Sequence, residues 1–205
     1  DAIANTFKFS LIATVLITVA GGLISYIIVR RETRLSGLLD TVLMVPYVVP
    51  GVVMAIGFLL TFNQGALDLV GTGAIIVLIL FIRRLPYGVR ATSSVLRQIK
   101  PSIEEAAISL GVSPARAFFK VTVPLMMPGV IAGAMMSFIT AINELSSTLL
   151  LYTARTATMP VRIYSAVLDG EFGIAAALST ILLVSSGLCV FVVLRFSRSK
   201  EGNFV

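Results

Sequence analysis

The chain has 205 residues, of which 57% are hydrophobic and 13% charged, and its formal net charge is +6. Its mean hydropathy is +1.00, and its charged share is about half of the ~25% that a typical soluble domain carries. The composition therefore argues against an ordinary soluble domain. The sequence contains no histidine, which excludes HExxH metal sites and Ser-His-Asp chemistry. Its single cysteine, Cys189, excludes an internal disulfide.

Five apolar segments are each close to or above the ~20 residues that an α-helix needs to cross a bilayer. In chain order they are residues 2–29, 38–62, 66–88, 125–143 and 172–194. The apolar runs are continuous rather than alternating, and lipid offers no partner for free backbone groups, so helices are favoured over a barrel. The sequence thus predicts an all-α, polytopic membrane protein with five transmembrane helices.

Two of these segments contain packing or kinking signals. Pro46 and Pro50 in "MVPYVVPG" should kink or delay the second segment. A broken helix can line the pathway of a transporter, so both prolines are pathway candidates. The alternative is that they are tolerated membrane prolines. In the fourth segment, Gly129-x-x-x-Gly133 predicts the close approach of a neighbouring helix.

The basic residues predict an orientation. Thirteen of the 16 Lys and Arg lie at the inner end of the third segment or after the first, third and fifth segments, on what would be one side of the membrane: Arg30, Arg31, Arg34, Arg83, Arg84, Arg90, Arg97, Lys100, Arg116, Lys120, Arg195, Arg198 and Lys200. The positive-inside rule then places the N-terminus of this segment outside and the C-terminus in the cytoplasm. Arg83 and Arg84 are interpreted as anchors that snorkel at the inner end of the third segment.

The polar loop 97–124 is predicted to form two short helices on the cytoplasmic side. Ser102 would be the N-cap of the first helix, and Glu105 would complete a capping box with it. Gly111 would end that helix, because glycine accepts a left-handed backbone. Ser113 and Pro114 would begin the second helix. The small and apolar residues of the first helix fit a partner's groove, or alternatively the ends of the membrane helices.

The same loop resembles the EAA motif of type I ATP-binding-cassette (ABC) importer permeases. The matching residues are Glu105-Ala106-Ala107, then three residues, Gly111, nine residues and Val121-Thr122-Val123-Pro124. The family pattern ends Ile-x-Leu-Pro, whereas this chain has Val-x-Val-Pro. The stretches "RRLPYGVRA" and "PLMMPGVIAGAMMSFITAINE" are also similar, so the resemblance covers nearly the whole chain.

The resemblance implies a function and a set of partners. Glu105, Ala106, Ala107, Gly111 and Pro124 would couple this chain to a separate cytoplasmic ATPase dimer, which would bind ATP and Mg and hydrolyse ATP. The chain itself would be a transport subunit with no catalytic residue, cofactor or metal of its own. It would assemble with a second permease half, either as a homodimer or as a fused half, and receive substrate from an extracytoplasmic solute-binding protein. The implied location is the bacterial inner membrane, and no nucleic acid is involved.

At the outer end of the fourth segment, Asn143 and Glu144 are pathway or gate candidates, because an ionisable group near membrane depth is often functional. The alternative is that Glu144 lies in interfacial water and accepts hydrogen bonds from Ser146 or Ser147.

The stretch "NELSSTLLLYTARTATMPVRIYSAVLDGEFG" is similar to permeases of ferric-iron importers. This resemblance predicts iron(III) as the substrate. The alternatives are another solute (2-aminoethylphosphonate, polyamine, thiamine or sulfate) and, from another class, an ATP-independent secondary transporter or channel. An intramembrane enzyme is disfavoured by the lack of histidine. A first residue other than methionine fits a piece of a longer, two-half permease.

Overall fold

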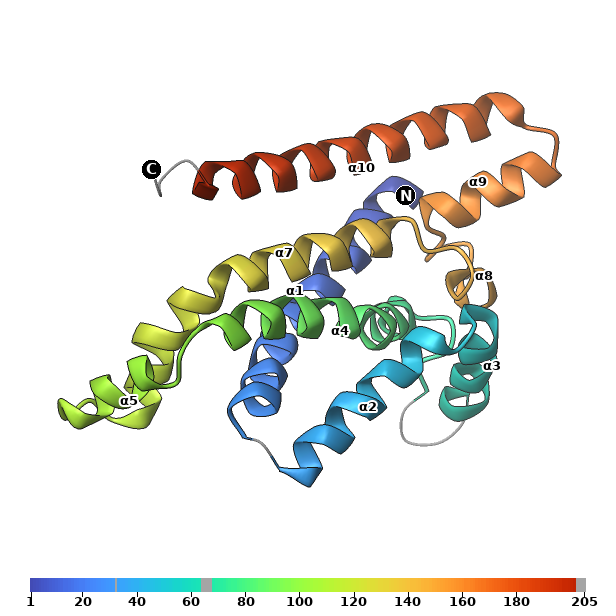
Figure 1. Cartoon of the computed structure of the whole chain (residues 1–205). Helices are drawn as coiled ribbons and strands as arrows, with labels where there is room; N and C mark the ends of the chain where they lie inside the picture. The colour runs from blue at the N-terminus through green and yellow to red at the C-terminus, as the bar shows by residue number, and fades with distance from the viewer. Residues whose placement is uncertain (32, 64–67, 202–205) are drawn as a thin grey trace.

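The computed structural model describes residues 1–31, 33–63 and 68–201, and helices dominate it throughout (Figure 1). Within these ranges no strand occurs, which confirms the all-α prediction. The elements are α1 (Ala2–Arg30), α2 (Arg34–Val48), α3 (Gly51–Phe62), α4 (Gly73–Gln98), α5 (Ser102–Ser109), α6 (Pro114–Ala117), the π-helical turn η1 (Phe118–Thr122), α7 (Val123–Ile142), α8 (Thr148–Leu151), α9 (Met159–Leu168) and α10 (Phe172–Glu201).

The centre of the fold is the group of α1, α4 and α7, in which each helix packs on the other two (Figure 1). Ile17 of α1 and Val89 of α4 are both fully buried in the contact between their helices. The hydroxyl of Ser25 donates a buried hydrogen bond of 3.0 Å to the Val89 carbonyl oxygen. Apolar packing and this polar contact together set the position of α4 against α1.

The predicted close approach at Gly129 and Gly133 of α7 is confirmed. A Cβ on Gly129 would lie 2.8 Å from the Ala91 carbonyl oxygen, and one on Gly133 would lie 2.9 Å from the Gly88 Cα. Both contacts are with the backbone of α4, which has no flexible end to move aside. Glycine is therefore required for α7 to lie this close to α4.

Replacing Gly133 by alanine should lower the free energy of unfolding by about 1–3 kcal/mol, because the new methyl group forces α7 away from α4. Gly187→Ala on α10 is the matched control, since a Cβ there meets no atom within 4 Å. Unfolding of the purified variants in one detergent measures both effects. Equal stability of the two variants would contradict the close packing of α4 and α7.

Three helical stretches are long and apolar enough to span a membrane: Ala2–Arg30, Pro114–Ile142 and Phe172–Val192. The pair α2 and α3 meets the same test only when taken together, and the two helices are bent by 104° at their junction. The described residues therefore give three spans, or four with the bent pair, and the expected count of five is not confirmed. Helix α4 has 26 residues, but four arginines interrupt its apolar character.

Helix α4 also shifts the expected third segment. The helix begins at Gly73, passes through Pro86 and continues to Gln98, ten residues beyond the predicted end at 88. Residues 66 and 67 of that segment lie outside the described residues. Pro86 is buried, so the packing of α4 against its neighbours holds the helix together where a proline alone would favour a break.

The predicted break in the second segment is confirmed. Pro46 lies inside α2, and Pro50 is the residue that precedes α3. Val49 between the two helices is extended, with φ −68° and ψ 128°, as expected for a residue before proline. The chain therefore turns sharply at Val49 and Pro50 rather than crossing as one straight helix.

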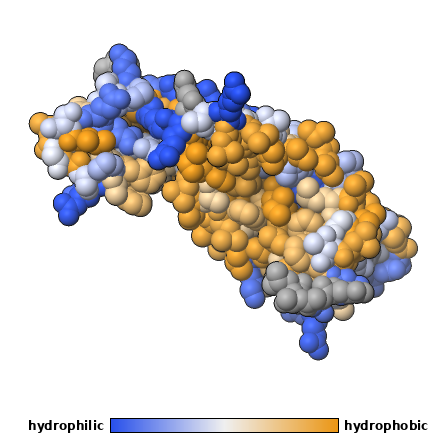
Figure 2. All heavy atoms as spheres, turned by 90° about the horizontal axis from the view of Figure 1, so that it is seen from below, coloured by the Kyte–Doolittle hydropathy of each residue, from blue (hydrophilic) through white to orange (hydrophobic). Residues whose placement is uncertain are grey.

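The face seen in Figure 2 is apolar over its middle, and hydrophilic groups gather toward its two ends. Helix α10, on the opposite side of the molecule (Figure 1), is also largely exposed. In its most apolar window only 6% of the residues are buried, compared with 39% for α1. Most of α10 thus faces away from the rest of the described chain, as expected for a helix in contact with lipid or with another protein.

Candidate functional site

Helix α5 lies at one end of the molecule, beyond the ends of α4 and α7 (Figure 1). All eight of its residues are described, and none of them is buried. Glu105, Ala106 and Gly111 are exposed, and Ala107 is half-buried. We call the stretch from Glu105 to Gly111 the coupling face, after the role that the resemblance to the EAA motif implies. It is open to contact from outside the chain.

The predicted capping box at Ser102 is wrong. Ser102 is the first helical residue of α5, the cap position is Pro101, and no side-chain capping hydrogen bond forms there. Pro101 already has helical angles, φ −56° and ψ −32°, so Ser102 lacks the extended backbone that an N-cap requires. The amide groups of Glu104 and Glu105 donate instead to the Pro101 carbonyl oxygen, at 3.0 and 3.1 Å.

The predicted end of α5 is confirmed in its geometry. Gly111 has a φ of +88°. Its amide donates to the Ile108 carbonyl oxygen at 2.9 Å, and the amide of Val112 donates to the Ala107 carbonyl oxygen at 3.1 Å. These two bonds form a Schellman motif, which places a left-handed residue after the helix. Pro114 begins α6 after Ser113, as predicted.

Pro124 is the second residue of α7, the helix that contains the predicted fourth segment. The helical run does not begin there, however, but continues without a break from Pro114 to Ile142. Within this run, η1 widens the helix, and the amide of Val123 donates to the Phe118 carbonyl oxygen. Pro124 has no N–H to offer the Lys120 carbonyl, which removes one α-type bond at this point. Single π turns of this kind are frequent at functional sites.

Glu104, next to the coupling face, has close partners that sequence reasoning missed. One of its carboxylate oxygens accepts a hydrogen bond of 2.5 Å from the Tyr26 hydroxyl, and the other accepts one of 2.9 Å from the Thr122 hydroxyl. Arg30 lies 3.9 Å away. The only signal in the sequence is that adjacent residues on a helix point in different directions, so one of two neighbouring glutamates can face inward.

A second group of polar side chains lies where α4 meets the segment after α7. We define the charge cluster as Arg83, Arg84, Glu144, Ser146 and Ser147. Glu144 is only 4% exposed and forms ion pairs with both arginines, at 3.6 Å for Arg83 and in direct contact for Arg84. The hydroxyl groups of Ser146 and Ser147 donate to the same carboxylate at 2.7 and 3.0 Å, and the Ser147 amide donates at 3.0 Å.

These contacts test one of the two interpretations of Glu144, namely that it lies in interfacial water. The predicted hydrogen bonds from Ser146 and Ser147 are confirmed, but Glu144 is buried in protein rather than placed in interfacial water. The prediction that Arg83 and Arg84 snorkel is wrong, because both side chains turn inward and are only 12–13% exposed. A buried carboxylate without a counter-charge is very costly, and the two guanidinium groups supply that charge.

The charge cluster also determines the ionisation of Glu144, which lies two residues beyond the end of α7. Burial alone would raise the pKa of this carboxyl group. The Arg84 charge, the hydrogen bonds from Ser146 and Ser147, and the Arg83 charge together lower the pKa below its ordinary value. Glu144 is therefore a stable anion in the fold.

The bent pair of α2 and α3, called the broken span below, lies directly against the charge cluster. A Cβ on Gly51, the first residue of α3, would lie 1.9 Å from Arg83 Nη1 and 2.3 Å from Ser146 Oγ. Beside it, the rings of Tyr47 and Tyr87 meet edge to face with centroids 5.7 Å apart. The structure thus brings Glu144 together with the chain around Pro46 and Pro50.

Asn143 takes part in a different contact from its neighbour Glu144. Its side-chain amide donates to the Ile139 carbonyl oxygen at 2.8 Å and to the Ser186 hydroxyl of α10 at 3.0 Å. Asn143 therefore joins α7 to α10, and the structure does not bring it into the charge cluster.

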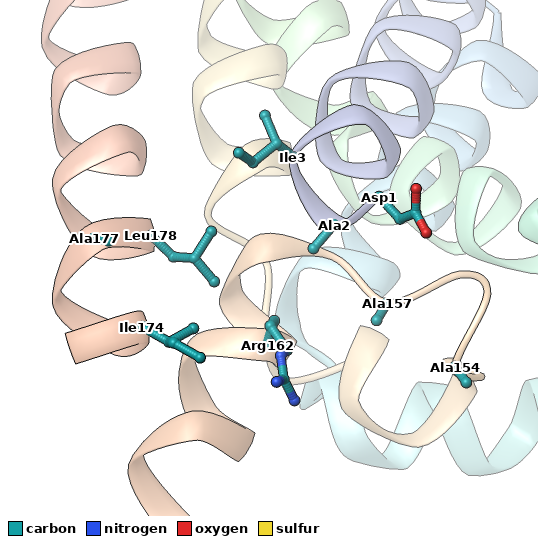
Figure 3. A pocket seen from close by; sticks show the side chains of 9 residues that line it. All are labelled: Asp1, Ala2, Ile3, Ala154, Ala157, Arg162, Ile174, Ala177 and Leu178. Carbon is teal, nitrogen blue, oxygen red and sulfur yellow. The ribbon is translucent and has the colours of Figure 1, made fainter. Parts of the chain in front are cut away.

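A hollow of about 460 Å³ opens between the start of α1, the loop before α9, and α10 (Figure 3). Its wall is mostly small or apolar, and Asp1 and Arg162 supply the charged groups at its edge. Leu178 of α10 points across the hollow toward Ala2 and Ile3 of α1 (Figure 3). Among the residues that the structure describes, no group of three or more His, Cys, Asp or Glu could hold a metal ion here or elsewhere.

Comparison with known proteins places this geometry in a family. The model of the binding-protein-dependent transport system inner membrane component family matches residues 17–200. A ferric transport system permease protein of Actinobacillus pleuropneumoniae is 34% identical over 89% of this chain, which spans only 27% of that relative. A molybdate/tungstate transport system permease protein of Pyrococcus abyssi is 29% identical over 92% of this chain and 74% of the relative.

A solved structure shows the same fold. A chain of the MetNI methionine ABC transporter, in inward-facing conformations, has a TM-score of 0.79 over 97% of this chain and 94% of its own length. The two sequences are only 14% identical, so this likeness concerns the fold alone. The family match, in contrast, covers most of the sequence. The chain belongs to the binding-protein-dependent transport system inner membrane components, the permease family of ABC importers.

Proposed function

We propose that this chain is the permease subunit of an ATP-driven importer and that α5 couples it to a separate ATPase. The observation that carries the proposal is the exposure of the coupling face at one end of the molecule. A helix that carries the EAA-type residues and has no buried residue is free to dock into a groove on a partner. Family membership supports the same assignment.

We further propose that α5 lies on the cytoplasmic side, with the N-terminus outside and the C-terminus in the cytoplasm. Arg30 donates to the Ile99 carbonyl oxygen at 3.0 Å, so the end of α1 and the end of α4 lie together beside α5. Arg83 and Arg84 lie within α4 and pair with Glu144, so they are left out of the count of basic residues near the cytoplasmic side. Eleven of the 16 Lys and Arg remain in the three basic regions, and this excess still favours the cytoplasm. The location is then the bacterial inner membrane.

The proposed partners follow from this arrangement. Two ATPase subunits that bind ATP and Mg would face two permease halves, of which this chain provides one. The second half would be another copy or a second half of one longer chain. A solute-binding protein would deliver the substrate from the outer side, where the broken span and the charge cluster would form the gate of the pathway.

We propose iron(III) as the substrate, supported by the similarity to the ferric permease of Actinobacillus pleuropneumoniae. The molybdate/tungstate relative makes an oxyanion the second candidate. Selection among substrates then rests mainly with the binding protein. Capturing the binding protein on this chain and identifying its bound ligand by mass spectrometry tests the proposal. A bound molybdate, tungstate or phosphonate would replace iron.

Co-purification of an ATPase with the chain separates this function from an ATP-independent transporter or channel. Uptake into vesicles should require ATP on the cytoplasmic side. Uptake that follows an ion gradient and proceeds without ATP would refute the proposed function.

Replacing Glu105 by alanine should reduce ATP-driven uptake roughly tenfold, the effect of losing about 1.4 kcal/mol of docking contact. The free energy of unfolding should change by less than about 0.5 kcal/mol, because Glu105 is exposed. Uptake and thermal unfolding are measured on the same preparation. Asp40→Ala is the control, since Asp40 forms a partly exposed ion pair with Arg90 away from the coupling face. Parallel losses of uptake and stability would count against a docking role.

A further inference from the structure

The two adjacent glutamates at the start of α5 lie in opposite environments. The Glu105 side chain is exposed, while that of Glu104 is 12% exposed and faces the membrane helices. The two residues differ by about 100° in direction around the helix axis. One is therefore available to a partner protein and the other is engaged within the chain.

Two elements contribute the partners of Glu104. Tyr26 and Arg30 come from the last turns of α1, and Thr122 comes from η1 at the base of α7. Arg30 also donates to the carbonyl oxygen of Ile99, the residue that ends α4. We define the Glu104 cluster as Tyr26, Arg30, Ile99, Glu104 and Thr122. The Glu104 carboxylate joins α5 to the end of α1 and the base of α7, and Arg30 extends the cluster to the end of α4.

The cluster has further support around it. The Tyr26 ring packs edge to face on Phe118 of η1, with centroids 4.7 Å apart. Thr122 is 1% exposed, so its hydroxyl is shielded from water and depends on Glu104 as an acceptor. Hydrogen bonds to an ionised group are about twice as strong as neutral ones, which favours a rigid contact.

The inference rests on the proposed function. We infer that Glu104 is the positioning residue that makes the coupling helix move together with α1 and α7 when the ATPase moves it. Because α5 has no buried residue, apolar packing alone does not hold it to the membrane helices. Without a hydrogen-bond acceptor at Glu104, the helix tilts on its own, and motion at the coupling face does not reach the spans.

A purely stabilising contact would not need a carboxylate at this position. Replacing a buried ion pair by apolar residues of similar volume is often neutral or stabilising. The acid instead provides three-way geometry, since its two oxygens accept from two hydroxyl groups and face one guanidinium. This geometry defines the direction of α5 relative to α1, which apolar packing would leave adjustable.

The test uses the complete transporter, with its ATPase bound, in lipid nanodiscs. Cys189 is the one cysteine of these 205 residues. In a background in which Cys189 and any reactive cysteine elsewhere in the transporter are replaced by serine, Val48→Cys accepts a nitroxide label. Val48 is 78% exposed and ends α2 beside the bend. The readouts are the rate of ATP hydrolysis and the change in the label's spectrum between ADP and ATP, neither of which requires a known substrate.

Glu104→Leu should reduce the ATP-driven spectral change roughly tenfold while ATP hydrolysis stays within about twofold of the parent. Glu104→Gln should restore most of the spectral change, because the amide oxygen still accepts from the Tyr26 hydroxyl. Tyr26→Phe, which removes one hydroxyl group, should lower the ATP-driven spectral change about threefold. Asp40→Asn is the matched acid-to-amide control and should leave both readouts unchanged, since it affects only a partly exposed ion pair.

The outcomes separate the two levels of the argument. If no ATPase co-purifies with the parent chain, the proposed function fails before any variant is compared. If the ATPase binds and the Glu104 variants lose hydrolysis and spectral change in parallel, or lose neither, the positioning role is overturned. If Glu104→Leu does not fold, Glu104→Gln and Tyr26→Phe test the positioning role instead, by the ratio of the ATP-driven spectral change to the rate of ATP hydrolysis.

Discussion

Replacing Glu144 by leucine should lower the free energy of unfolding by about 3–5 kcal/mol, because it leaves buried guanidinium groups without a counter-charge. Both Arg83 and Arg84 already have guanidinium nitrogens that are buried without a hydrogen-bond partner, so the protein has no second acceptor ready for them. Chemical unfolding in detergent measures the loss. The change should also loosen the start of α3, which packs on Arg83 through Gly51.

The control for this prediction removes the charges together. In the triple variant Arg83→Met, Arg84→Met and Glu144→Leu, no unpaired ion remains, and most of the lost stability should return. If Glu144→Leu alone were within about 1 kcal/mol of the parent, the charge cluster would not be a buried ion pair of the kind that the structure shows. Uptake by the triple variant would then report how far the cluster matters to the gate itself.

Replacing Gly111 by valine should abolish most ATP-driven uptake with little effect on the fold of the membrane helices. A residue with a side chain pays about 1–2 kcal/mol to adopt a left-handed backbone, and β-branching increases the strain. A Cβ at Gly111 meets no atom within 4 Å, so the effect arises from the backbone and not from crowding. The end of α5 should unwind and displace the coupling face.

Gly111→Asn is the matched variant, since asparagine tolerates this backbone conformation better than valine does. It should keep a large part of the uptake that valine removes, and both variants should show the same thermal unfolding. Uptake that is equal in the two variants, whether retained or lost, would show that the turn geometry at Gly111 does not govern coupling.

Local features of this chain could be predicted from the sequence because their causes are local. Gly111 ends α5 and Pro114 begins α6 through backbone preferences that act within a few residues. Pro50 breaks the second segment for the same kind of reason. The EAA spacing identified the family, which the family match over residues 17–200 confirms.

Some errors are local, such as the one at Ser102, but the larger ones arose where distant contacts override a local preference. Ser102 has a good local signal for an N-cap, but Pro101 starts the helical geometry one residue earlier. Arg83 and Arg84 look like interfacial anchors until Glu144, 60 residues beyond Arg84, is folded against them. The partners of Glu104 lie 78 and 18 residues away, at distances where no sequence period connects them. The arginines within α4 are polar, so the apolar pattern predicted an end at residue 88, whereas the helix continues to Gln98.

The exposure of α10 on the surface of the chain has a consequence for how this protein can be handled. A helix that meets so little of its own chain takes its stability from whatever solvates it, whether acyl chains, detergent or a neighbouring subunit. Melting temperatures of this polypeptide are then joint properties of the chain and its surroundings. Exchanging a long-chain for a short-chain detergent should perturb the C-terminal helix first and leave the packed centre of α1, α4 and α7 intact.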